Sequence, residues 1–106
     1  MSLEANPTSA LGPYAVYRSG STEPWTVDVL CALIAAQQPS IVVETGTFEG
    51  RTALRFLEAM RTYAETKLSR LYTIEHDPDR VTQAEAYLRA SGVNVDWQLA
   101  CGDAIQ

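Results

Sequence analysis

The feature that most constrains the fold is a regular alternation of helical and extended hydrophobic patterns between residues 21 and 106. Short runs typical of strands stand at Ile41–Val43, Leu71–Ile74 and Val95–Leu99, and a segment with helical spacing of apolar residues precedes each run. Parallel strands joined by right-handed helical crossovers are the usual solution for such alternation. We therefore predict an α/β fold whose three strands, wound outward from the first, lie in the order 3-2-1.

Each helical segment has a predicted end and a predicted buried face. The first segment begins after Ser21 or Thr22 as the N-cap and ends before Pro39, and the third ends at Gly92. Apolar residues at helical spacing predict the buried faces: Trp25, Val29, Ala32, Leu33 and Ala36 in the first segment, Ala53, Phe56, Leu57, Met60, Tyr63 and Ala64 in the second, and Val81, Ala84 and Leu88 in the third.

The first and third strands differ in pattern. Ile41–Val43 is a continuous β-branched run without polar alternation, which predicts a central parallel strand buried on both faces. Val95, Trp97 and Leu99 alternate with polar residues, which predicts an edge strand with one wetter face.

The length of 106 residues fits one compact domain. Residues 1–20 contain prolines and glycines with little periodicity, so we predict a loosely ordered arm there and a folded half domain over residues 21–106. The chain ends soon after the third strand, which leaves one edge of the Ile41–Val43 strand without a predicted partner. We expect the sequence to be part of a longer chain, with a homodimer that covers this edge as the alternative.

Charge and composition exclude several classes of function. The formal net charge is -5 and no run of Lys or Arg is present, which argues against nucleic acid and anionic membranes as partners. No apolar stretch approaches the about 20 residues needed to cross a bilayer, and no export signal opens the chain, so we expect a cytoplasmic protein. Cys31 and Cys101 lack metal-binding spacing, and no metal site is predicted.

Acidic residues and glycines gather where the predicted strands end. In a doubly wound sheet, ligands bind beyond the carboxyl ends of the strands, where Glu44–Gly50, Glu75–Asp77 and Cys101–Ala104 converge. Gly46 and Gly50 allow a tight turn that brings backbone N–H groups near a ligand. The carboxylate of Glu75 is placed to accept hydrogen bonds from both hydroxyls of a ribose.

The loop between Glu44 and Gly50 departs from the dinucleotide-binding fingerprint. Phe48 stands where that fingerprint has its middle glycine, and Glu44 and Glu49 would repel a pyrophosphate. A ligand that carries an ammonium and a sulfonium suits this loop better. The alternatives are structural: Glu44 as a helix cap, Glu75 as a turn residue, and the glycines as turn chemistry alone.

Three motifs together resemble those of the class I S-adenosylmethionine-dependent methyltransferases, and within them the small-molecule O-methyltransferases. Val42–Gly50 is similar to the family's glycine motif, Leu71–Pro78 to its second motif and Gly102–Ala104 to its third. Thr45 stands where glycine or an apolar residue is commoner. The resemblance implies a Rossmann-like three-layer sandwich of which residues 21–106 form the first half, with S-adenosylmethionine as the cofactor.

The resemblance also implies roles for single residues. Glu44 would help hold the methionine ammonium, and Glu75 would take the ribose hydroxyls. Asp103 would accept from the adenine amino group, with His76 and Ala104 packed around the adenine. The loop residues that would pass along the methionine moiety are Gly46, Thr47, Phe48 and Gly50.

No catalytic base or metal ligand can be assigned, because in the family these come from later strands. His76 is the single histidine of the chain, and an exposed turn position is the better interpretation of it. We therefore expect a cofactor-binding half whose full-length form O-methylates a small molecule. A nicotinamide-dependent oxidoreductase and a non-catalytic nucleotide-binding or assembly module are the alternatives.

Overall fold

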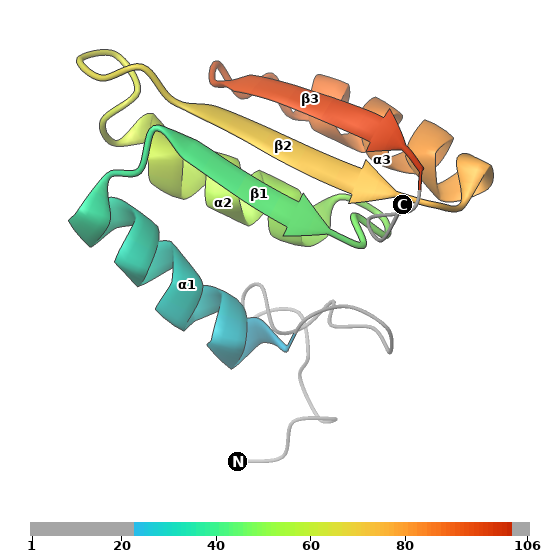
Figure 1. Ribbon diagram of the computed structural model, residues 1–106, viewed down its shortest axis with the longest axis horizontal. Helices are drawn as coiled ribbons and strands as arrows, with labels where there is room; N and C mark the ends of the chain where they lie inside the picture. The colour runs from blue at the N-terminus through green and yellow to red at the C-terminus, as the bar shows by residue number, and fades with distance from the viewer. Residues whose placement is uncertain (1–22, 103–106) are drawn as a thin grey trace.

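The computed structural model describes residues 23–102, and these residues form an α/β fold with the predicted alternation of elements. Figure 1 shows the elements in chain order: α1 (Pro24–Gln37), β1 (Ile41–Thr45), α2 (Arg51–Arg61), β2 (Arg70–Glu75), α3 (Pro78–Ser91) and β3 (Asp96–Cys101). The expected arm over residues 1–20 lies outside the described residues, as do residues 103–106.

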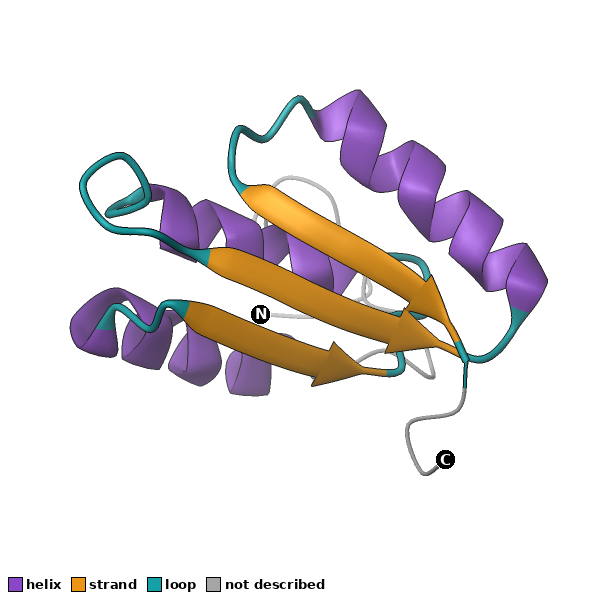
Figure 2. Ribbon diagram, turned by 45° about the horizontal axis from the view of Figure 1, so that its top comes forward, coloured by secondary structure: helices purple, strands orange, loops and turns teal. Residues whose placement is uncertain are grey.

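The strands form one parallel sheet in which β2 lies between β1 and β3, so the predicted order 3-2-1 is confirmed (Figure 2). Val42 of β1 lies opposite Leu71 of β2, which lies opposite Trp97 of β3. All three strands therefore end at the same edge of the sheet, where Glu75 pairs with Cys101 in the register.

Local sequence explains where α3 begins and ends. The carboxylate of Asp77 accepts a hydrogen bond from the backbone N–H of Asp79 at 3.0 Å, and Pro78 occupies the first turn. Gly92 adopts a left-handed conformation with φ of 69° just after the helix, as predicted. The proline and glycine thus fix the length of the crossover from β2 to β3.

The core lies between the sheet and the two crossover helices, α2 and α3. Leu57 and Met60 of α2, Leu71 of β2 and Leu88 of α3 are its largest fully buried apolar side chains. Each side chain of this size contributes roughly 1.5–3 kcal/mol when it is removed from water. The predicted buried face of α2 is confirmed by this packing.

The predicted buried face of α1 is wrong. Trp25 and Val29 are 63% and 61% exposed, whereas Val27 and Ile34 are buried against the core. The helix is apolar on most sides, so periodicity alone cannot choose its buried face. In the observed orientation of α1, Asp28 forms an ion pair with Arg55 of α2, with 2.6 Å between Oδ1 and Nη2.

The prediction that β1 is buried on both faces is also wrong within residues 23–102. Ile41 and Val43 are 60% and 61% exposed, because α2 and α3 both cover the opposite face of the sheet (Figures 1 and 2). Two right-handed crossovers that advance in the same direction place their helices on the same face. The second edge of β1 has no strand partner among the residues described.

Candidate ligand-binding site

The loop between β1 and α2 is built from residues in the left-handed conformation. Gly46, Phe48 and Gly50 have φ angles of 76°, 56° and 87°. The N–H groups of Gly46 and Thr47 both donate to the carbonyl oxygen of Ile74, at 2.7 and 3.2 Å, which fastens the loop to the end of β2. Glycine suits these turns because it adopts positive φ without steric cost.

The carboxylate of Glu75 lies at the centre of the site, with only 2% of the residue exposed. Its Oε1 accepts the N–H of Phe48 at 2.7 Å, and its Oε2 accepts the N–H of Asp77 at 3.1 Å. The N–H of Gly102 donates to its backbone carbonyl oxygen at 3.0 Å. Glu75 therefore connects all three segments that the sequence predicts to converge.

A second carboxylate, that of Glu44, belongs to a chain of hydroxyl hydrogen bonds. The hydroxyl of Thr73 donates to Glu44 Oε1 at 2.6 Å, and the hydroxyl oxygens of Thr73 and Thr47 lie 2.5 Å apart. Burial raises the pKa of Glu44 to about 7, opposed by the hydrogen bond from Thr73 and assisted by the negative charge of Glu75. A positive group placed beside Glu44 would favour its ionised form.

The outer side of the site is formed by Phe48, Arg80 and His76. The guanidinium carbon of Arg80 lies 3.8 Å from the centroid of the Phe48 ring, and its Nε lies 3.8 Å from Oδ2 of Asp77. His76 is exposed, with Nδ1 at 3.5 Å from Glu75 Oε2. The exposed position predicted for this histidine agrees with the structure.

The predicted residues Glu44, Gly46, Thr47, Phe48 and Glu75 lie together at the carboxyl edge of the sheet. Gly50 is the N-cap of α2, and a Cβ added there would meet Ala84 of α3 at 3.4 Å, which is an ordinary van der Waals contact, so its φ of 87° and not the space favours glycine. His76 borders the site. The two remaining predicted residues, Asp103 and Ala104, lie outside the described residues.

Sequence reasoning missed Thr73 and Arg80. Thr73 is the polar residue within the otherwise apolar Leu71–Ile74 run, and it is fully buried. A polar residue inside an apolar strand indicates that its side chain has polar partners, here Glu44 and Thr47. Arg80 gave no such signal, because a charged residue in the first turn of a helix is most often solvated.

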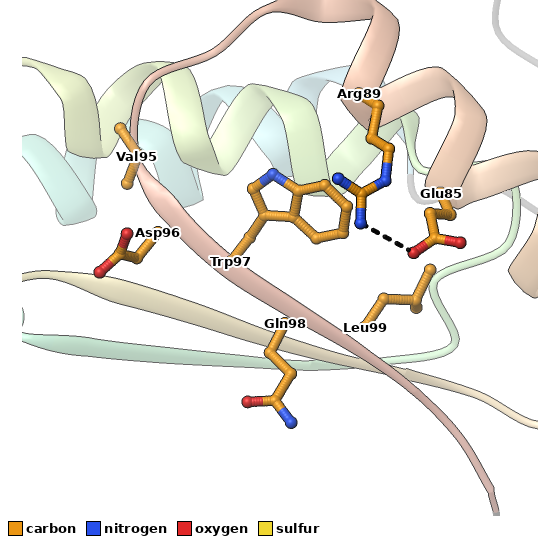
Figure 3. A pocket seen from close by; sticks show the side chains of 7 residues that line it. All are labelled: Glu85, Arg89, Val95, Asp96, Trp97, Gln98 and Leu99. Atoms are coloured by element: carbon orange, nitrogen blue, oxygen red, sulfur yellow. Dashed lines mark hydrogen bonds and ion pairs between the residues drawn. The ribbon is translucent and has the colours of Figure 1, made fainter.

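Other surface features of residues 23–102 lie apart from this edge. A depression of about 370 Å³ beside β3 is lined by side chains from α3 and β3 (Figure 3).

Within the described part of the chain, no cluster of His, Cys, Asp or Glu could hold a metal ion. None of the helices described is long and apolar enough to span a membrane.

Comparison with solved structures identifies the fold. The chain is similar to the S-adenosylhomocysteine-bound methyltransferase of Podospora anserina, with a TM-score of 0.70, 19% identity and coverage of 80% of this chain and 35% of that one. The O-methyltransferase TomG of Streptomyces achromogenes, in complex with S-adenosylmethionine, gives a TM-score of 0.69 at 23% identity, covering 81% and 36%. A methyltransferase of Geobacter sulfurreducens gives a TM-score of 0.62 at 27% identity, and the match covers 77% of this chain and 39% of that one.

These similarities show that residues 23–102 have the fold of the corresponding part of a class I methyltransferase, as the sequence motifs predict. The chain spans 35–39% of the length of these three structures. No protein-family model matches the sequence, and a search of curated proteins found no match.

Proposed function

We propose that this chain is the S-adenosylmethionine-binding half of a methyltransferase. The observation that carries the proposal is the buried carboxylate of Glu75 at the end of β2, beside a loop of left-handed residues. This is the position at which a doubly wound sheet binds a ribose. Two of the three solved structures compared above are described as bound to S-adenosylhomocysteine or S-adenosylmethionine, which supports this choice of ligand.

The charges of the site fit this cofactor. Glu44 and Glu49 place two carboxylates at the end of β1 and in the loop after it, where a dinucleotide would bring its pyrophosphate, so a phosphate group would be repelled. An amino acid ammonium beside Glu44 and ribose hydroxyls beside Glu75 would be attracted instead. The ammonium would also favour ionisation of Glu44 from its raised pKa of about 7.

The remaining predicted residues complete the proposal. Backbone groups of the loop Gly46–Gly50 would pass along the methionine moiety. His76, Asp103 and Ala104 would surround the adenine. When it is bound, S-adenosylmethionine supplies a methyl group activated by its sulfonium, and these residues would hold and orient it.

We further propose that the full-length protein O-methylates a small molecule. TomG is described as an O-methyltransferase involved in the synthesis of tomaymycin, and this supports the assignment. This chain covers 36% of the TomG chain, and by the family resemblance the residues that choose the methyl acceptor and remove its proton would come from the rest. Detection of methyl transfer to a hydroxyl by the full-length protein would test this second step.

Calorimetric titration with S-adenosylhomocysteine and, separately, with NADH tests the cofactor assignment. We expect the chain to bind S-adenosylhomocysteine and Glu75→Gln to weaken binding about 10- to 100-fold, since a hydrogen bond to a charged group contributes about 1.5–3 kcal/mol. Glu85→Gln on the exposed side of α3 is the matched control and should bind as the wild type does. Binding of NADH alone would refute the proposal, and binding of neither ligand would favour a non-catalytic assembly module.

A further inference from the structure

The carboxylate proposed to bind the ribose is closed off from solvent. Glu75 is 2% exposed, and each of its carboxylate oxygens already accepts a backbone N–H, from Phe48 at 2.7 Å and from Asp77 at 3.1 Å. Ribose hydroxyls cannot reach a group with so little exposed surface. A ligand can therefore bind Glu75 only after the segment that covers it has moved.

The loop residue Phe48 donates its N–H to the buried carboxylate and is held in a conformation that its side chain disfavours. Its φ angle of 56° lies in the left-handed region, which a bulky residue rarely occupies. Two contacts hold it there: the N–H bond to Glu75, and the guanidinium of Arg80, which lies 3.8 Å from the ring centroid. The separation is short for a cation over an aromatic face.

These contacts close into a ring of four residues. Arg80 pairs with Asp77 at 3.8 Å, and the N–H of Asp77 is the second donor to Glu75. Each residue of the ring thus contacts the next, in the order Glu75, Phe48, Arg80 and Asp77. The ring joins the segment after β1 to the segment after β2 at the Glu75 carboxylate. Neither Arg80 nor Asp77 has a predicted contact with the cofactor, and Arg80 is the one whose side chain contacts the Phe48 ring, so its removal tests the closure.

We propose that Arg80 is a positioning residue that acts through Phe48 and keeps the loop closed over Glu75 until a ribose-bearing ligand displaces it. This inference rests on the proposed function for the identity of the ligand. The closed loop satisfies the buried carboxylate with backbone N–H groups in place of ribose hydroxyls. Arg80 thereby sets how often the site is open.

The expected size of the effect follows from the population of the open loop. When only a fraction of molecules is competent to bind, the apparent Kd equals the intrinsic Kd divided by that fraction. The loss of an exposed cation–π contact shifts such an equilibrium by about two- to five-fold. Arg80→Gln should therefore lower the apparent Kd by about two- to five-fold, whereas loss of a residue that contacts the ligand would raise it.

The ligand experiment uses calorimetric titration with S-adenosylhomocysteine at pH 8. This ligand lacks the sulfonium charge, and its carboxylate balances its ammonium, so its net charge is zero and removal of the Arg80 charge relieves no net repulsion with it. The matched control is Arg89→Gln, because Arg89 lies on the same helix, stacks 5.4 Å from the Trp97 ring and pairs with Glu85 beside β3 (Figure 3). The control should leave the Kd unchanged, and Arg80→Lys, which keeps a cation near the ring, should restore part of the wild-type value.

A second readout needs no ligand and separates this inference from the proposed function. Amide hydrogen exchange at Phe48 should be about two- to five-fold faster in Arg80→Gln than in the wild type, and unchanged in Arg89→Gln. An unchanged or slower exchange at Phe48, or a Kd that rises in Arg80→Gln, would overturn the inference. If no variant binds S-adenosylhomocysteine but exchange at Phe48 is accelerated, the cofactor assignment fails and the closure by Arg80 is supported.

Discussion

Replacing Glu44 by glutamine should stabilise the protein at alkaline pH and have little effect in acid. Burial raises the pKa of Glu44 from its ordinary value of 4.5 to about 7 in the folded protein. The folded state therefore binds more protons than the unfolded state between these two pH values, and its free energy of unfolding falls as the pH rises through them. Glutamine removes this dependence and still offers an oxygen to the hydroxyl of Thr73, which donates to Glu44 at 2.6 Å.

The magnitude follows from the difference between the two pKa values. At about 1.36 kcal/mol per pKa unit, ionising Glu44 in the folded state costs roughly 3 kcal/mol. Above pH 7 the carboxylate is ionised in both states and the full cost applies, so Glu44→Gln should be about 3 kcal/mol more stable at pH 8. Below pH 4.5 it is protonated in both states, and the two proteins should differ by less than about 0.5 kcal/mol.

Urea unfolding at intervals between pH 4 and pH 8, followed by far-ultraviolet circular dichroism, measures this difference. The control is Glu58→Gln, since Glu58 is an exposed glutamate of α2 and its replacement should change the free energy of unfolding only slightly. The reasoning would be refuted if the difference in the free energy of unfolding between Glu44→Gln and the wild type stayed constant with pH, or grew toward acid.

Further predictions concern ligand binding, the glycine loop, the core and the sheet edge. The affinity for S-adenosylhomocysteine should rise between pH 5.5 and pH 8 as Glu44 ionises, and calorimetry of Glu44→Gln should show a flat profile. Gly50→Ala should lower the free energy of unfolding by about 1–2 kcal/mol in urea titrations, because alanine disfavours the φ of 87° at this position. Leu57→Ala should cost about 2–5 kcal/mol in the same assay, because the side chain is fully buried. The open edge of β1 should make the purified chain self-associate in light scattering, and Val43→Lys should suppress this; a monodisperse wild-type monomer would contradict the expectation.

The sequence by itself determined the order and direction of the elements around the candidate site. The β-branched run at Ile41–Val43, the proline at 39 and the glycine at 92 are local signals, and their effects on the backbone need no distant partner. Outward winding of the sheet then gives the strand order, and the parallel direction of the strands gathers Glu44 and Glu75 at one edge. Roles for Asp103 and Ala104 stay predictions.

Only the tertiary structure decided which faces of α1 and β1 are buried and how the acidic residues are partnered. The apolar α1 could turn any of several faces inward, and its contacts with α2 chose Val27 and Ile34. Thr73 and Arg80 lie far from Glu44 in sequence. The parallel register brings the hydroxyl of Thr73 to Glu44, and the start of α3 brings Arg80 to the Phe48 ring. Burial and hydrogen bonding depend on these long-range contacts. The residue types therefore predicted a carboxylate site, while the fold set the raised pKa of Glu44 and the burial of Glu75.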